Sequence, residues 1–321
     1  MQVMRHVLLI VLLSMPRVAA AACEQICYPG LPCQGTEISG ERTVTEDLCA
    51  GDLVLMDGAR LILEGDGSRL ISAERSLKIV GSAEILAASC LATTSKPAKA
   101  NSPASANPFD RGPGSNGPGD ATAGRNGPNG GDGVNGTSGA RGQNAGSVSL
   151  AFAEFAGGSI KICAHGSNGT PGQDGGNGAA GGDGEQGGRA IPGQPFGCAS
   201  GPGDGGNGGN GGSAGRGGNG GDGGVGGTVA LAVPSSLEGF VRGMLAKQIV
   251  VDVSGGRPGE KGLAGSAGAA GKFGYGGRGA RGCDGREEQR KGHDGAPGPA
   301  AANGRDGLAG ADGKVVVDAK N

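Results

Sequence analysis

Aromatic side chains are almost missing from this sequence. Its 321 residues include no tryptophan, two tyrosines and six phenylalanines, so aromatic residues make up 2% of the chain. Because such side chains bury the most apolar area per residue, we do not expect a conventional large core. Proline is scarce for a collagen: the chain has 17 prolines, whereas collagen-like sequences have about 15–20% or more.

Long apolar segments are also lacking. The run at residues 7–13 follows Arg5 and His6 and precedes an alanine-rich stretch at residues 18–22, which predicts a secretory signal over residues 1–22. The run is too short to cross a bilayer, and nothing later predicts a membrane helix. We therefore expect a secreted, extracellular or cell-surface protein, with the periplasm or a lipoprotein anchored at Cys23 as alternatives.

No excess of basic charge is present. Without Arg5 and Arg17, 26 basic residues face 30 acidic ones, a net charge of −4. This balance gives no electrostatic case for binding nucleic acid or anionic lipid. The expected partner is an extracellular surface, a glycan or a protein.

Signatures of catalysis and of metal binding are lacking too. The only histidines after the predicted signal, His165 and His293, lie in or beside glycine runs and are interpreted as solvated loop residues. The sequence has no nucleophile elbow, no HExxH helix and no P-loop after a strand. Residues 130–135 match part of a calcium nonapeptide, but Asn135 stands in place of the acid. We expect no catalytic residue, no metal, no cofactor and no enzyme activity.

Glycine is what the chain has in excess, at 75 of 321 residues. In residues 203–227 glycine recurs every third residue at nine stations, and the third place of each triplet is also glycine except at Ala214. A period of three is that of the polyproline II helix. Glycine on two faces would let neighbouring backbones approach from two sides.

Short alternating strands surround the glycine runs. They are predicted at residues 53–55, 60–63, 70–72, 76–80, 84–86, 148–155, 159–164, 228–233, 248–253 and 314–319. Their even spacing suits a parallel β-solenoid, with an antiparallel sandwich as the alternative. One helix is predicted over residues 235–247, with Ser235 and Glu238 as a capping box and an apolar stripe that covers an edge of the sheet.

The predicted fold class is all-β, with a short-stranded β-solenoid body and a bundle of glycine-rich polyproline II or polyglycine II helices. The predicted domains are the signal at 1–22, a cysteine-rich N-terminal cap at 23–50, β-solenoid rungs at 51–90, and strands alternating with three glycine-rich excursions over 91–321. The excursions span 91–147, 166–227 and 255–313. A monomer is favoured; a collagen-like homotrimer and flexible glycine loops are the alternatives.

All eight cysteines follow the predicted signal, which predicts four disulfides in an oxidising compartment. Two local bridges are expected among Cys23, Cys27, Cys33 and Cys49. We predict that Cys90 pairs with Cys163 at the base of the excursions. Cys198 and Cys283 each lie about 30 residues beyond a strand, so we predict that they pair near the tips.

The distal corners interrupt the glycine period and concentrate residue types that are scarce elsewhere. These residues are Phe196, Phe273, Tyr275, Arg278 and Arg281. The corners are predicted to be either recognition loops or simple turn caps.

Two resemblances follow from these patterns. Residues 157–166 and 248–256 resemble exported bacterial β-helix proteins with glycine-rich loops. The glycine runs are similar to the polyglycine II bundles of springtail antifreeze proteins, phage tail-tip adhesins and the glycine-rich domain of ribosome-associated GTPases. These families imply surface recognition or scaffolding, and no catalytic residue is carried over. The expected function is a non-enzymatic secreted or cell-surface structural or adhesive module; a collagen-like homotrimeric surface protein and an ice-binding protein are the alternatives.

Overall fold

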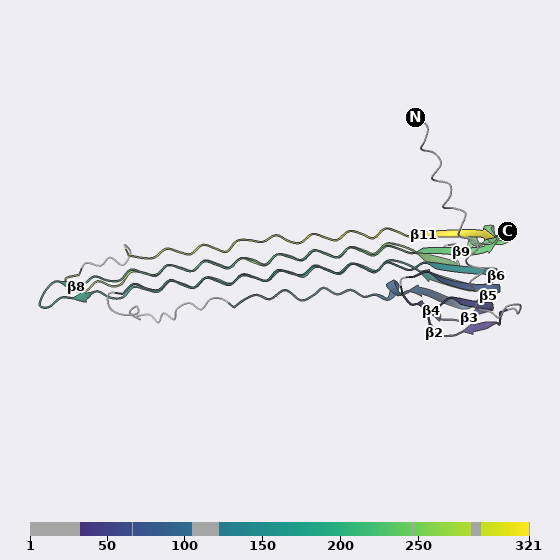
Figure 1. Cartoon of the computed structure of the whole chain (residues 1–321), viewed down its shortest axis with the longest axis horizontal. Helices are drawn as coiled ribbons and strands as arrows, with labels where there is room; N and C mark the ends of the chain where they lie inside the picture. The colour runs from purple at the N-terminus through teal and green to yellow at the C-terminus, as the bar shows by residue number, and fades with distance from the viewer. Residues whose placement is uncertain (1–32, 66, 105–121, 246, 284–289, 321) are drawn as a thin grey trace, which may run out of the picture.

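A β-sheet body lies at one end of the molecule, and long glycine-rich runs project from it (Figure 1). The computed structural model describes residues 33–65, 67–104, 122–245, 247–283 and 290–320. The predicted signal, Cys23 and Cys27 lie outside these residues. The elements in chain order are β1 (Thr36–Ile38), β2 (Glu41–Val44), β3 (Leu48–Leu55), β4 (Ala59–Leu63), β5 (Arg69–Ala87), the 3-10 helix η1 (Ala88–Leu91), β6 (Val148–Cys163), β7 (Ile191–Pro192), β8 (Cys198–Ser200), β9 (Thr228–Pro234), α2 (Ser235–Met244), β10 (Ile249–Asp252) and β11 (Lys314–Lys320).

The body is one nine-stranded sheet whose strand pairs are all parallel. Its main path runs β1-β3-β5-β6-β9-β11. The later halves of β5 and β6 carry a second series, in which β2 pairs with β4, β4 with β5, and β10 with β6. The antiparallel sandwich is therefore wrong. The sheet already begins at Thr36, within the segment predicted to be the cysteine-rich cap.

The predicted fold class is also wrong. The structure is a mostly parallel β-sheet with one α-helix in the described residues, not a body of short strands with a polyglycine II bundle. Strand β5 has 19 residues and β6 has 16. Three predicted strands merge into β5 and two into β6. The register of this pair shifts between Ala73 and Ser76 and again between Ile79 and Ser82, and the pairing resumes after each shift; Gly81 and Gly157, with positive φ, lie at the second shift. The glycine-rich runs belong to no strand or helix.

Aliphatic side chains fill the core of the body. Along the parallel strands Ile71 lies opposite Leu150, and Leu150 lies opposite Leu231. These three side chains are at most 1% exposed. Such apolar ladders across neighbouring strands stabilise the sheet. The shortage of aromatics therefore did not prevent a core, because leucine, isoleucine and valine build it.

Helix α2 follows β9 directly and covers part of the sheet through Val241 and Met244, which are buried. The predicted helix is confirmed, but its capping box is not. The N-cap is Pro234, and the hydroxyl of Ser235 donates to the carbonyl of Lys320 at 3.1 Å. Phe240 of the same helix is 54% exposed and does not join Val241 and Met244 against the sheet.

Five glycine-rich runs lie side by side along the long axis of the molecule (Figure 1). We call them runs 1 to 5, at residues 124–145, 166–190, 203–227, 254–279 and 290–313, and together the glycine stalk. Each run is hydrogen-bonded antiparallel to the next, as where the Gly206 N–H donates to the Glu185 carbonyl at 2.8 Å. Run 3 is also bonded in parallel to run 1 and to run 5, and run 2 is bonded in parallel to run 4.

Run 3 is bonded to all four other runs, which explains its double glycines. The amide of Gly209 donates to run 2, and that of Gly208 to run 5, each at 2.8 Å. A Cβ on Gly209 would overlap the carbonyl of Pro128 in run 1, and one on Gly208 would overlap the carbonyl of Gly271 in run 4. Close approach on two sides therefore requires glycine at two places in each triplet.

In many triplets of the described residues, one backbone amide has no carbonyl partner in another run, and an asparagine or aspartate side chain accepts its hydrogen bond. The amide oxygen of Asn129 accepts the N–H of Asn210 at 2.8 Å, and that of Asn210 accepts the N–H of Ala296 at 2.8 Å. Carboxylates do the same: Asp132 accepts from Ser213 and Asp306 from Lys261. These side chains thus meet the requirement that backbone amides find acceptors.

One level of the stalk departs from the glycine pattern. Alanines occupy both position 214 in run 3 and position 301 in run 5. The bonds from Ala214 N and Gly217 N to run 5 are 3.0 and 3.2 Å, against 2.7–2.9 Å elsewhere along this pair of runs. In the described residues, no bond joins Ala301 N to the Gly265 carbonyl, although its neighbours in run 5 make the equivalent bond. The two methyl groups spread the runs locally.

Candidate functional site at the distal corner

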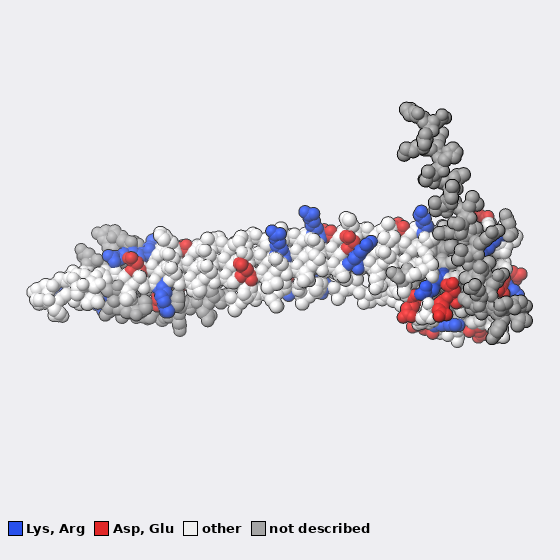
Figure 2. Space-filling view, viewed as in Figure 1, with Lys and Arg blue, Asp and Glu red and all other residues white. Residues whose placement is uncertain are grey.

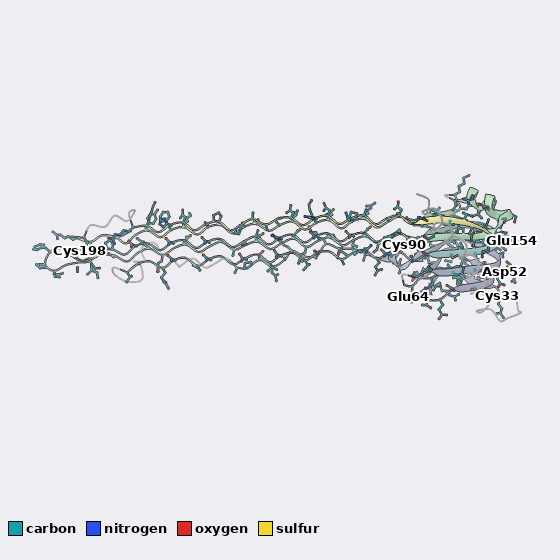
Figure 3. The ribbon with its side chains drawn as sticks, turned by 45° about the horizontal axis from the view of Figure 1, so that its top comes forward. Cys33, Asp52, Glu64, Cys90, Glu154 and Cys198 are labelled. Atoms are coloured by element: carbon teal, nitrogen blue, oxygen red, sulfur yellow. A yellow bond between two sulfur atoms is a disulfide. The ribbon has the colours of Figure 1, made fainter. Side chains whose placement is uncertain are left out.

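A disulfide lies at each end of the stalk. Cys90 is bonded to Cys163 beside the sheet, and Cys198 to Cys283 at the far end (Figure 3). Both predicted pairs are therefore confirmed. Cys33 and Cys49 are also disulfide-bonded, and Cys23 and Cys27 lie outside the described residues. These disulfides indicate an oxidising environment.

The distal corner is a small antiparallel hairpin of β7 and β8. The amide of Gly193 donates to the Gly197 carbonyl at 2.9 Å and closes the turn. The segment that carries Cys283 packs against this turn, because a Cβ on Gly282 would lie 2.6 Å from the Gly197 carbonyl oxygen. The disulfide and this contact fix the hairpin to the end of run 4.

Phe196 is the most exposed large apolar side chain of the described residues, at 89%. It sits in the turn of the hairpin, where Ile191 is also exposed, at 38%. The structure thus places one predicted recognition residue at the extreme end of the stalk.

The other predicted recognition residues form a second group on run 4. Phe273 and Tyr275 contact edge to face, with ring centroids 5.2 Å apart. Lys291 lies 4.9 Å from the centroid of the Phe273 ring. Because the Tyr275 carbonyl accepts from the Gly187 amide, this group lies several residues short of the hairpin.

The two predicted arginines lie nearer the hairpin. The Arg278 carbonyl accepts from Ala190, next to β7, and Arg281 is exposed. The structure therefore does not unite the five predicted residues in one site. Lys291 and Ile191, which sequence reasoning missed, could have been found only from the pairing of runs 4 and 5 and from the exposure of the hairpin.

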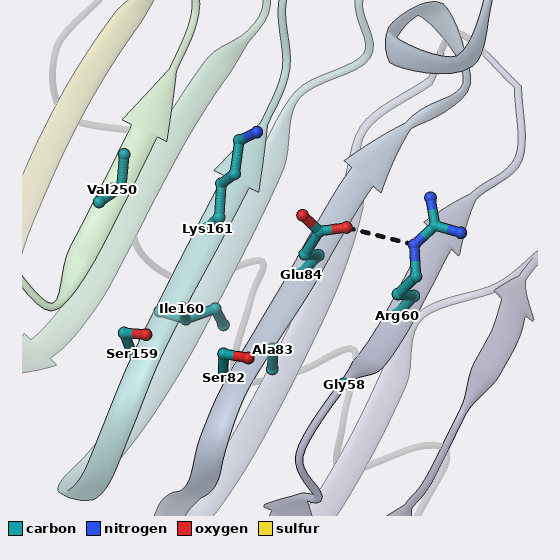
Figure 4. Close-up of a pocket in the computed structure, with 9 residues that line it drawn as sticks. All are labelled: Gly58, Arg60, Ser82, Ala83, Glu84, Ser159, Ile160, Lys161 and Val250. Carbon is teal, nitrogen blue, oxygen red and sulfur yellow. Dashed lines mark hydrogen bonds and ion pairs between the residues drawn. The ribbon is translucent and has the colours of Figure 1, made fainter.

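A shallow groove crosses strands of the sheet body (Figure 4). Its volume is ≈ 290 Å³, and Glu84 is the acidic residue in its lining. Glu84 pairs with Arg60 at 3.2 Å, and Arg60 also contacts Glu41 at 2.8 Å. With its carboxylate held by a guanidinium, this lining offers no pair of acids for general acid–base catalysis.

The cysteine–histidine cluster at the base is structural. Cys90, Cys163 and His165 bring ligand-type atoms within 4.8 Å of one another. Both sulfur atoms are joined in a disulfide, so neither can offer the thiolate that a metal requires. His165 remains beside the Gly166 carbonyl, with Nδ1 at 2.9 Å.

Three carboxylates of the stalk have lowered pKa values, those of Asp132, Asp174 and Asp306. The N–H of Ser213 lowers the pKa of Asp132, and the N–H of Lys261 lowers that of Asp306. For Asp174, the N–H of Leu263 is the main cause, and Lys96 adds to it at 3.1 Å. In each case the hydrogen bond favours the ionised carboxylate.

No family model matches the chain, and no curated protein does. Among solved structures, the chain is similar to a springtail antifreeze protein from Granisotoma rainieri, described as a nine polyproline type II helical bundle. The identity is 23% over 54% of this chain and 93% of that one, with a TM-score of 0.07. That score shows no shared fold, so it supports neither the expected polyglycine II bundle nor the resemblance to β-helix proteins. Within the described residues, no helix has the length and apolar character that crossing a membrane requires.

Proposed function

We propose that the protein is a non-enzymatic, secreted or cell-surface structural module, whose glycine stalk carries the distal corner away from the sheet body. The observation that carries this proposal is the hydrogen bonding of run 3. Its amides donate to runs 2 and 5, and its carbonyls accept from runs 1 and 4, along the whole length of the stalk. A segment held on every side at each triplet is a stiff spacer.

The reach of the stalk favours spacing over a flexible tether. Residues 203–227 span at most about 85 Å when extended. A disordered glycine-rich chain of that length would have a root-mean-square end-to-end distance of about 30 Å. An extended, ordered run can therefore reach up to more than twice as far as a disordered one, and its hydrogen bonds fix the direction of the hairpin.

The acceptors for the glycine amides lie within the same chain. In a collagen-like trimer the glycine amides would bond to other chains, whereas here Gly212 N donates to Ala179 O and Gly298 N to Gly268 O. This supports a monomer. The homotrimer and ice binding stay predictions from composition.

Small-angle X-ray scattering with light scattering on the unreduced protein tests the proposal. A compact chain of this length would have a radius of gyration of about 20 Å. We expect a monomer with a clearly larger radius and the pair-distance distribution of a rod. A compact monomer or a trimer would overturn the spacer.

A further inference from the structure

The end of the corner is an uncharged, apolar projection. Residues 190–203 contain no charged side chain. We call residues 191–200 the finger. Phe196 and Ile191 are exposed in it at 89% and 38%, together with Pro192 and Pro195. On the face seen in Figure 2, the far end of the stalk carries no charged side chain, and charged side chains of both signs begin behind it.

The finger is held rigid although its apolar side chains support no core. The disulfide Cys198–Cys283 and the Gly193–Gly197 hydrogen bond fix its backbone. Phe196 is so exposed that its ring contributes little to folding. A simple turn cap has no need of a large apolar side chain facing water. A rigid loop presenting such a side chain is instead preorganised for binding, since little conformational entropy is lost on contact.

Basic side chains lie at the root of the finger. Arg189 precedes β7, and Arg281 precedes the glycine that packs against the turn; both are exposed. Neither has an ion-pair partner in the part of the chain that the structure describes. Two acidic neighbours are already paired: Glu185 contacts Arg125 at 3.0 Å, and Asp204 lies 3.8 Å from Arg290. The net negative charge of the chain hides this local arrangement.

We propose that the finger inserts into the surface of an anionic lipid bilayer, with Phe196 and Ile191 among the acyl chains and Arg189 and Arg281 at the headgroup phosphates. Apolar insertion combined with basic residues is the chemistry of interfacial membrane binding. A protein partner fits less well, because a stable protein interface takes about 20–30 residues a side, more than the finger offers. A bilayer needs no matching pocket. This inference rests on the proposed function, because the stalk must hold the finger clear of the body.

Vesicle flotation tests the inference with the full, unreduced protein. We expect it to float with vesicles of phosphatidylcholine and phosphatidylglycerol, and less with phosphatidylcholine alone. Phe196→Ser should weaken binding roughly tenfold or more, the effect of losing one buried aromatic ring. Arg189→Gln with Arg281→Gln should weaken it by roughly thirtyfold and reduce its salt dependence. Asp284, Glu287 and Glu288 lie outside the described residues. The salt dependence of binding therefore serves as a direct measure of whether the net charge at the base of the finger is positive.

Matched control variants distinguish binding through the finger from non-specific binding of the protein to vesicles. Phe240→Ser removes a phenylalanine that is 54% exposed on α2, and Arg305→Gln removes an exposed arginine on run 5. Neither should change flotation. Absence of flotation, or equal binding by Phe196→Ser, would overturn the inference. A rod-shaped monomer that does not bind vesicles would contradict this inference alone. A compact particle in scattering would contradict the proposed function.

Discussion

Replacing Gly208 by alanine tests whether close backbone contact holds the stalk together. Gly208 and Ala214 occupy the same place in their triplets of run 3. A Cβ at Gly208 would overlap the carbonyl of Gly271 in run 4. That carbonyl is held in place, because it accepts the N–H of Gly295 at 2.9 Å. Gly208→Ala must therefore push run 4 away from run 3.

The level that carries Ala214 and Ala301 indicates the size of the effect. There, two methyl groups accompany one absent backbone bond and two lengthened ones. A lost hydrogen bond costs about 1 kcal/mol net, and overpacking costs about 1–3 kcal/mol. Alanine restricts the unfolded chain, which offsets about 0.4–1 kcal/mol. We expect Gly208→Ala to lower the free energy of unfolding by about 1–3 kcal/mol.

The reverse change is the matched comparison. Ala214→Gly loses a buried methyl group, about 0.8 kcal/mol, and frees the unfolded chain by about 0.4–1 kcal/mol. It regains up to about 1 kcal/mol of hydrogen bonding. The net effect should be a loss of about 0.2–1.8 kcal/mol. Gly239→Ala on α2 is the control, because nothing lies within 4 Å of a Cβ there.

Hydrogen exchange read by mass spectrometry, with denaturant unfolding of the unreduced protein, provides the measurement. Gly208→Ala should raise exchange in peptides from runs 3, 4 and 5 around the substitution and leave the sheet body protected. Ala214→Gly and Gly239→Ala should leave exchange unchanged both in these peptides and in the sheet body. If Gly208→Ala kept both its protection and its unfolding midpoint, close packing would not be what holds the runs.

Two further perturbations address the carboxylates and the distal disulfide. Because the folded-state pKa of Asp132 is lowered below its ordinary 3.8, its stabilisation is present above that value and is lost as pH falls through the lower pKa. Exchange of the Ser213 amide should accordingly lose protection in acid, whereas Asp132→Asn, which keeps an acceptor oxygen, should make protection independent of pH; equal acid sensitivity in both proteins would contradict this. Replacing Cys198 and Cys283 by serine opens a loop with a sequence separation of 85, which should lower the free energy of unfolding by up to about 4.5 kcal/mol. Denaturant unfolding measures this, and an unchanged midpoint would refute it.

The sequence predicts the close packing of the glycine runs better than the lengths of the strands. Glycine at every third residue predicted close backbone contact between runs, and the distances of Cys198 and Cys283 from their strands predicted their pairing. Both follow from chain geometry alone. Strand lengths did not, because Gly81 and Gly157 look like turn signals in sequence. Only neighbouring strands decide that a positive-φ glycine bends a ladder instead of ending it.

The candidate site was predictable only in composition. Phe196, Phe273 and Tyr275 are scarce residue types, and their concentration near the corners was visible in the sequence. Their division between the finger and the side of run 4 was not, because it depends on which residue of run 4 lies beside which residue of run 2. The contact of Lys291 with Phe273 depends in the same way on the pairing of runs 4 and 5.

Those pairings are inherited from the sheet. Val148 pairs with Val229 in the sheet, and Asn126 accepts from Asn207 in the stalk, both 81 residues apart. The strand pair Thr228–Lys314 and the stalk pair Asn207–His293 have the same sequence separation, 86 residues. The strand pair Ile160–Ile249 and the stalk pair Asn168–Arg257 are likewise both 89 residues apart. Each parallel pairing of runs thus continues a pairing of strands.

This continuity explains how a repetitive stalk reaches one register. Glycine triplets are nearly alike, so two runs could slip by three residues and recover most of their hydrogen bonds. A strand cannot shift its pairing by three residues in this way. A shift by an odd number of residues would turn Leu150 and Leu231 from the core to the surface. The apolar ladders of the body therefore choose the register, and the stalk transmits it to its far end. There it brings Cys198 and Cys283 together, and their disulfide holds the finger in place.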